Sequence, residues 1–122
     1  MARRTTPKDS QMAIISAHWT VTIHPLAEPE LKALAADLQA RFVHIAELLE
    51  SFGPQHVGLP HIRPLNNKLW EMRMSGRDGI ARAVYVAVQN RRLLVLHVFV
   101  KKTPSTPRQA LLIARQRWED AA

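Results

Sequence analysis

Residues 69–100 read LWEMRMSGRDGIARAVYVAVQNRRLLVLHVFV and carry the clearest structural signal in the sequence. Apolar and polar residues alternate in 69–74 and again in 80–88, which predicts two strands. The segment SGRDG at 75–79 is rich in turn-forming residues, so these two strands should form a hairpin. Residues 92–100 form a nearly continuous apolar run, which is typical of a central strand covered on both faces.

The sequence before these strands predicts one more strand and a helical hairpin. WTVTIH at 19–24 is rich in β-branched and aromatic residues, and Pro25 ends it. From Glu28 to Ser51 apolar residues recur every three or four positions, as on one face of a helix. Asp37 is a candidate N-cap that would split this stretch into two helices. The pair Gly53-Pro54 should end the second one.

The rest of the chain predicts a loop, a tail and a last helix. Residues 55–68 are rich in Gly, Pro and Asn and predict a loop. Ser105 or Thr106 should cap a C-terminal helix with Pro107 at its first position. The apolar face of that helix should be formed by Leu111, Leu112 and Trp118.

One domain is expected at 18–122, after a flexible N-terminal tail at 1–17 that shows no periodicity. The predicted fold class is α+β. A small, mostly antiparallel sheet carries an N-terminal helical hairpin on one face and a C-terminal helix, in the order strand-helix-helix-strand-strand-strand-helix.

Composition narrows the class of partner. The chain has no cysteine, which fits the reducing cytoplasm, and its longest apolar run, Leu93–Val100, is too short to span a membrane. The net charge is +7 and the pI about 10.8. Residues 18–52 include two basic and five acidic side chains, whereas residues 63–117 include twelve basic and two acidic ones. We therefore expect a cytoplasmic protein whose second half attracts a polyanion such as RNA, a ribosome or an acidic protein.

The basic residues of the second half should meet on one face of the sheet. Glu71 and Arg73 are two apart on a strand and share a face, with Arg82 on the neighbouring strand. Lys101 and Lys102 follow the last strand. The alternative is a set of solvated sheet arginines that simply pair with Glu71.

Such a cluster suits RNA cleavage by the 2′-hydroxyl, which needs a proton acceptor, cations around the phosphate and a proton donor. Arg and Lys can supply the positive field without a metal or cofactor, so neither is expected, and Glu71 is a candidate base. His97 lies inside the apolar run, where a core histidine is the alternative to an acid or base. His56 and His61 lie in a loop without a carboxylate ligand, so a metal site there is not expected.

An ordered series of short motifs resembles the phage-derived, HigB-like branch of the RelE/ParE toxin superfamily of type II toxin–antitoxin systems. The series, which covers roughly residues 19–120, is listed here in chain order: Phe52-Gly53-Pro54, Leu59-Pro60-His61, Pro64-Leu65, Leu69-Trp70-Glu71-Met72-Arg73, Arg82-Ala83-Val84-Tyr85, Leu96-His97-Val98-Phe99-Val100-Lys101-Lys102-Thr103 and Thr106-Pro107. The family's fold has the element order expected above.

The resemblance implies a toxin that cleaves mRNA, with the ribosome as a probable requirement, and that is neutralised by a cognate antitoxin, a small helix-turn-helix protein. A ParE-like inhibitor of DNA gyrase, without catalysis, is the alternative on the same fold. The resemblance places Arg82 at the family's phosphate-binding arginine, and it matches Arg73 and Lys102 to basic positions. Ala81 stands where a tyrosine is usual.

One departure concerns the base that flanks the cleaved bond. Several ribonucleases of this family carry a tyrosine near the start of the last helix, but residues 105–108 read STPR, without an aromatic side chain. Either Phe99 or the guanidinium of Arg108 then provides stacking, or cleavage is weak or absent. Lys101 and Lys102 are the expected RNA contacts beside them.

Overall fold

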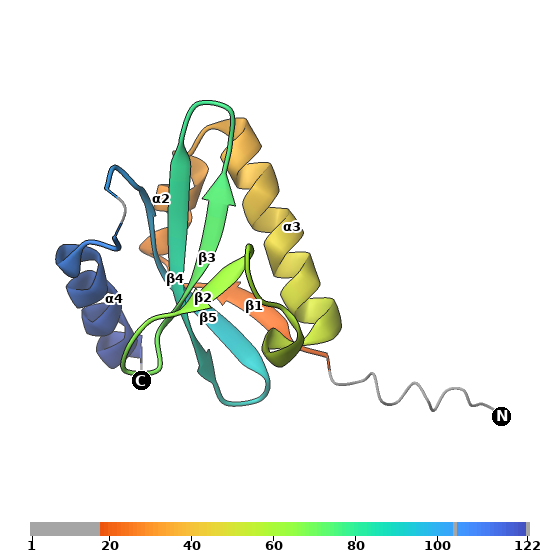
Figure 1. Ribbon diagram of the computed structural model, residues 1–122. Coiled ribbons are helices and arrows are strands. Elements are labelled where there is room, and N and C mark those ends of the chain that lie inside the picture. Colours follow the sequence, from red (N-terminus) through yellow and green to blue (C-terminus); the bar gives the residue numbers. More distant parts are fainter. Residues whose placement is uncertain (1–17, 104, 122) are drawn as a thin grey trace, which may run out of the picture.

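The computed structural model describes residues 18–103 and 105–121, so the tail predicted at 1–17 lies outside the described residues (Figure 1). The elements are, in chain order, β1 (Thr20–Ile23), α2 (Ala27–Lys32), α3 (Ala36–Phe52), the 3₁₀ turn η1 (Pro54–His56), β2 (Ile62–Pro64), β3 (Trp70–Ser75), β4 (Ile80–Val88), β5 (Arg92–Val100) and α4 (Arg108–Ala121). No helix in this part of the chain is long and apolar enough to cross a membrane.

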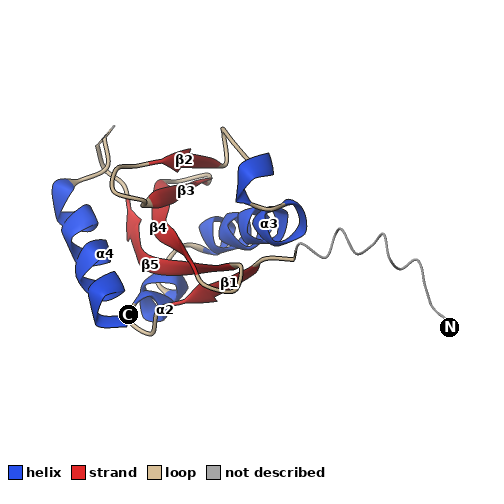
Figure 2. Cartoon of the chain, turned by 90° about the horizontal axis from the view of Figure 1, so that it is seen from below, coloured by secondary structure: helices blue, strands red, loops and turns tan. Residues whose placement is uncertain are grey.

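The strands form one five-stranded sheet in the order β1-β5-β4-β3-β2. Strands β2 to β5 pair antiparallel in sequence, and β1 pairs parallel with β5, with Thr20 opposite Arg92. Helix α3 packs on one face of the sheet and α4 on the other (Figure 2). The predicted α+β class is confirmed, and β5 is flanked by two strands as its apolar run predicted.

Two clusters of buried side chains lie on the two faces of the sheet. The first core joins the sheet to α2 and α3 and includes Phe42, Ile45, Met72 and Tyr85. The second core lies under α4, where Leu111 and Trp118 pack against β4 and β5. The alternation predicted for β3 is confirmed, because Met72 and Met74 are fully buried in the first core and Glu71 lies on the opposite face.

The loop predicted at 55–68 contains the short edge strand β2, which the sequence signals did not indicate. Its three residues include Pro64, and its pairing with β3 places Arg63 opposite Glu71. A three-residue edge strand is too short to show alternation, and its Gly and Pro neighbours are typical of loops, so local patterns could not reveal it.

The predicted helix caps were wrong. Ala35 occupies the N-cap of α3, and the carboxylate of Asp37 instead accepts a 2.6 Å hydrogen bond from the backbone N–H of Arg77 in the β3–β4 turn. A Cβ at Gly76 would lie 2.5 Å from that carboxylate oxygen, so any other residue there would require the Asp37 side chain to move.

Helix α4 begins at Arg108, one residue later than predicted, and Pro107 lies just before it. The hydroxyl of Thr106 binds Glu71 instead of capping this helix. Leu112, predicted to lie on its apolar face, is 54% exposed, because the helix buries the opposite stripe around Ala110 and Ala114.

Candidate functional site

A buried carboxylate surrounded by arginines lies on the α4 face of the sheet. Glu71 has no exposed surface, and its Oε2 is 2.9 Å from Arg63 Nη2, 3.0 Å from Arg73 Nη1 and 3.6 Å from Arg82 Nε. Its Oε1 accepts a 2.6 Å hydrogen bond from the hydroxyl of Thr106. Both carboxylate oxygens are therefore engaged, and the three guanidinium groups are held together by one negative charge.

Strand register explains why these side chains meet. Arg63 is opposite Glu71 across β2 and β3, and Arg73 is opposite Arg82 across β3 and β4. Glu71 and Arg73 are two residues apart, so they project from the same face. The sheet thus brings residues from three strands to one point, as the sequence predicted for Glu71, Arg73 and Arg82.

Arg82 is the most enclosed of the three arginines, with 5% of its surface exposed. Its Nη1 donates a 2.9 Å hydrogen bond to the carbonyl of Ala81, but its buried Nε has no hydrogen-bond partner among the described residues. Burial and the neighbouring charge of Arg73 lower the pKa of Arg82, whereas Glu71 raises it. Glu71 Oε2 lies 3.6 Å from this Nε, so the buried guanidinium is paired with the carboxylate by charge but not by a hydrogen bond.

A shallow pocket of about 350 Å³ opens beside Arg82 at the beginning of β4 and the end of β5. The described residues that line it are Ile80, Arg82, Lys101, Lys102 and Thr103. Lys101 is buried and Lys102 exposed. Burial, followed by the charge of Arg82, lowers the pKa of Lys101. No carboxylate is present in this described lining, so the pocket is suited to an anionic group.

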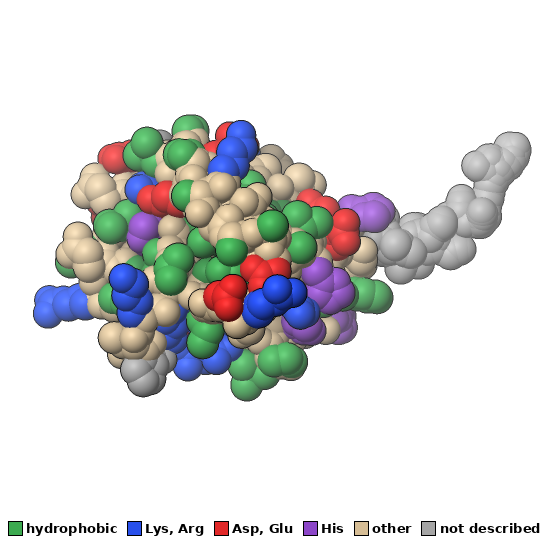
Figure 3. Space-filling model, turned by 90° about the horizontal axis from the view of Figure 1, so that it is seen from above, with side chains coloured by type: hydrophobic (Ala, Val, Ile, Leu, Met, Phe, Trp, Pro, Cys, Tyr) green, Lys and Arg blue, Asp and Glu red, His purple; other side chains and the backbone are tan. Residues whose placement is uncertain are grey.

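We call Arg63, Arg73, Arg82, Lys101 and Lys102, arranged around Glu71, the cationic cluster. In the view from the side of the β3–β4 turn, acidic, basic and histidine side chains are interspersed on the surface (Figure 3).

Two further residues predicted to contact RNA lie near the cationic cluster. Phe99 is opposite Arg82 in the β4–β5 pairing, but its ring packs against the second core and stacks on His97, with centroids 5.1 Å apart. Arg108 is exposed at the start of α4. Of the two, Arg108 is the side chain available to a ligand.

His97 belongs to a separate network that joins α2, β5 and α4. Its Nδ1 is 3.0 Å from Glu30, and Arg117 makes two 2.9 Å hydrogen bonds to the same carboxylate. Burial opposes ionisation of Glu30, but hydrogen bonds from Arg117, the Val98 N–H and His97 lower its pKa. This arrangement suits a structural histidine, the alternative considered from the sequence.

His61 contacts His44 edge-on, with ring centroids 5.8 Å apart. The described residues contain no group of three or more metal-binding side chains.

The sequence did not single out Arg63 as part of the site. The motif Pro64-Leu65 includes only the last residue of β2, and only the strand register could have brought Arg63 to Glu71. Thr106 is a predicted helix cap, but its hydroxyl donates to Glu71 and so joins the start of α4 to the cationic cluster.

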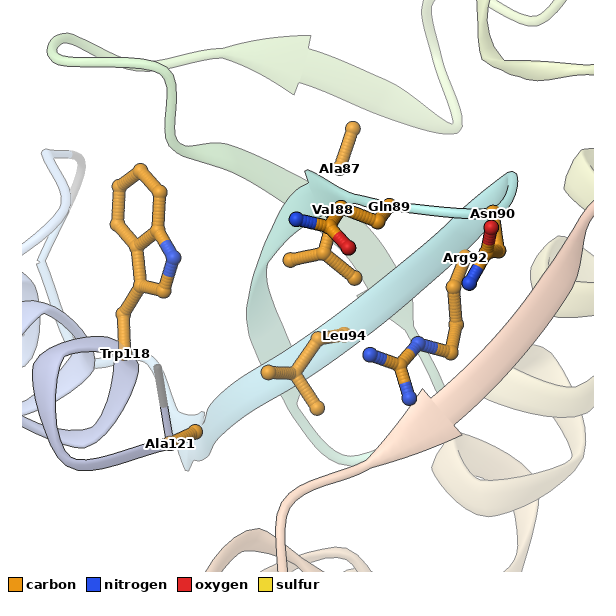
Figure 4. A pocket seen from close by; sticks show the side chains of 8 residues that line it. All are labelled: Ala87, Val88, Gln89, Asn90, Arg92, Leu94, Trp118 and Ala121. Carbon is orange, nitrogen blue, oxygen red and sulfur yellow. The ribbon is translucent and has the colours of Figure 1, made fainter.

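The largest pocket described, about 410 Å³, lies at the other end of the sheet (Figure 4). Trp118 forms one wall, Leu94 and Val88 form the floor, and Arg92 lies on the rim. It is distant from the cationic cluster along β4, and we assign it no role.

The family model described as "Phage derived protein Gp49-like" matches residues 29–119. This chain belongs to that family. The matched region of the Gp49-like protein contains the whole cationic cluster. Among curated proteins, no sequence matches it.

Two solved structures resemble the Gp49-like protein in fold. The RelE of an archaeal RelE–RelB complex from Pyrococcus horikoshii OT3 has 20% identity and a TM-score of 0.52, and the match covers 68% of this chain and 94% of that one. The free E. coli toxin RelE, in a doubly substituted form, has 14% identity and a TM-score of 0.59, with coverage of 82% and 97%. The Gp49-like protein therefore has a RelE-like fold.

Proposed function

We propose that this protein is the toxin of a type II toxin–antitoxin pair and that it acts as a metal-independent mRNA endonuclease of the HigB-like branch, on the ribosome and in the cytoplasm. The observation that carries the proposal is the pocket at the end of β5, which Arg82, Lys101 and Lys102 line with no carboxylate among its described lining residues. Anionic phosphate is the group such a site would stabilise best.

The proposed reaction is attack of a 2′-oxygen on the adjacent phosphorus. The bond from phosphorus to the 5′-oxygen breaks, which leaves a 2′,3′-cyclic phosphate and a free 5′-hydroxyl. Negative charge grows on the phosphate oxygens in the transition state, where Arg82 and Lys102 stabilise it. Lys101 gives a proton to the leaving 5′-oxygen, a role that its lowered pKa favours because the ammonium becomes a stronger acid.

Glu71 takes a positioning role in this proposal and not the role of base. A base must reach the 2′-hydroxyl, but Glu71 is fully buried and both its oxygens already accept hydrogen bonds or ion pairs. It fixes the guanidinium groups of Arg73 and Arg82 in place before substrate arrives. A water molecule then accepts the proton of the 2′-hydroxyl.

The partner we propose is a cognate antitoxin, a small helix-turn-helix protein, with an acidic segment that covers the cationic cluster. Opposite charges accelerate association and are screened by salt. The association rate should therefore fall as ionic strength rises, and an unchanged rate would contradict this mode of neutralisation.

One observation favours the non-catalytic ParE-like alternative. Residues 105–108 contain no aromatic side chain, and neither a carboxylate nor an imidazole is present among the described residues that line the pocket. A surface of this kind can also bind a protein such as DNA gyrase without chemistry.

The test is mRNA cleavage in a translating extract with wild type, Arg82→Ala and Arg82→Lys. Removal of a preorganised donor should lower the cleavage rate about 100- to 1000-fold, and lysine should restore only part of it because it lacks the planar fork. Arg41→Gln on α3, which removes one charge away from the site, is the matched control. Circular dichroism verifies folding.

Two results would count against the proposal. If Arg82→Ala cleaves mRNA at the wild-type rate, the site is misplaced. If the wild type arrests growth without cleaving mRNA but lowers supercoiling by gyrase, the ParE-like alternative is correct.

A further inference from the structure

We propose that the cationic cluster binds two neighbouring phosphates of one RNA strand, and that Arg63 and Arg73 bind the second phosphate. The inference rests on the proposed function, since it concerns how the same site holds its substrate. It predicts that the ligand is an extended single strand and not a mononucleotide.

The cluster is divided into two parts by Glu71. Arg82, Lys101 and Lys102 line the pocket at the end of β5, whereas Arg63 and Arg73 are not part of its lining. Both of these arginines instead approach Glu71 from β2 and β3. With one phosphate in the pocket, these two guanidinium groups would still share the single negative charge of Glu71 with Arg82.

Arg63 and Arg73 are built to accept such a ligand. Their side chains are 39% and 26% exposed, compared with 6% for Arg82. Each uses one nitrogen to contact Glu71, and the described residues offer no other partner to either guanidinium. Because a guanidinium has five N–H donors, one contact with Glu71 leaves most of the donors of each arginine without a partner among the described residues.

Charge and placement support a second phosphate. Glu71 supplies one negative charge against three arginines and two lysines, so the cluster retains a large excess of positive charge. The three guanidinium groups converge on Glu71, whereas Lys101 and Lys102 follow the end of β5 and line the pocket beside Arg82. A strand of RNA with one phosphate in the pocket and the next beside Arg63 and Arg73 would contact both parts of the cluster.

The experiment measures binding of short 2′-O-methyl trinucleotides, which lack the nucleophile and cannot be cleaved. One trinucleotide has two phosphodiesters, and the others carry one neutral methylphosphonate linkage. In the wild type the second charge should tighten binding about tenfold, the scale of one charge-assisted contact. In Arg63→Gln this gain should nearly disappear, while Arg41→Gln keeps it.

Arg73→Gln is a second variant with the same expectation, and thermal unfolding followed by circular dichroism verifies that each variant is folded. An equal gain from the second phosphate in Arg63→Gln, Arg73→Gln and wild type would overturn the inference, because the arginines would then act only as a general field. No binding of either trinucleotide by the wild type would also overturn it. Cleavage of mRNA in the extract tests the proposed function separately.

Discussion

Replacement of Glu71 by glutamine tests whether this carboxylate organises the cationic cluster. The side chain is fully buried, contacts three guanidinium groups and accepts a hydrogen bond from Thr106. Glutamine has nearly the same shape, so packing is preserved and only the charge is lost. Arg82, itself almost fully buried, would then lack a neutralising partner.

The expected loss is large because breaking a buried ion pair from one side costs roughly 3–5 kcal/mol. With Arg63 and Arg73 partly exposed, solvent offsets part of that loss, and we expect roughly 2–4 kcal/mol. For a urea slope of about 1.5 kcal/mol per molar, the unfolding midpoint should fall by roughly 1.3–2.7 M.

The assay is urea unfolding followed by circular dichroism, with Arg73→Gln and the double variant completing a cycle. The double variant should be less destabilised than the sum of the single ones, since removing both partners leaves fewer unpaired charges. A loss below about 1 kcal/mol for Glu71→Gln would refute the reasoning, because the carboxylate would then not be holding the arginines.

Three further predictions concern the side chains of Tyr85, Glu30 and Lys101. Tyr85→Phe should leave stability unchanged or raise it by about 1 kcal/mol, since the buried hydroxyl has no hydrogen-bond partner among the described residues; a clear loss in thermal unfolding would show a missed partner. Glu30→Gln should destabilise the protein by roughly 1–3 kcal/mol at neutral pH. Folding lowers the pKa of Glu30, so this carboxylate stabilises the folded state above its unfolded pKa. That stabilisation is lost as the pH falls through the folded-state pKa. In unfolding measured as a function of pH, the stability difference between wild type and Glu30→Gln should therefore shrink below about pH 4. If Lys101 is the proton donor, the rate of mRNA cleavage should fall at alkaline pH as its ammonium group loses a proton. The fall should begin at a lower pH than for an ordinary lysine, because the pKa of Lys101 is lowered. A cleavage rate that stays constant up to about pH 11 would exclude this role.

Periodicity predicted the strands and helices that have long amphipathic patterns. The alternation in β3 and β4 and the apolar run of β5 were sufficient to place Glu71, Arg73 and Arg82 on one face. These features are local, since each strand's side chains alternate whatever its partners are. That is why the centre of the candidate site could be predicted.

The features that were missed depend on contacts between distant segments. Arg63 joins the cluster because β2 pairs with β3 in one particular register, and no local pattern specifies that register. Asp37 and Thr106 have sequences typical of caps, but each side chain binds a tertiary partner instead. Short polar side chains satisfy whichever donor or acceptor the folded chain brings near, so their sequence position alone did not decide their role.

The parallel pairing of β1 with β5 affects the timing of folding during synthesis. Thr20 pairs with Arg92 and Ile23 with Val95, so β1 can pair only after the ribosome has added more than seventy further residues. Contacts of such long separation form slowly, and chains are made at about 5–20 residues per second. The segments that hold the cationic cluster, from Arg63 to Thr106, are also made late. A nascent chain therefore lacks the assembled site for most of its synthesis, and a co-expressed partner has several seconds in which to be present before activity can appear.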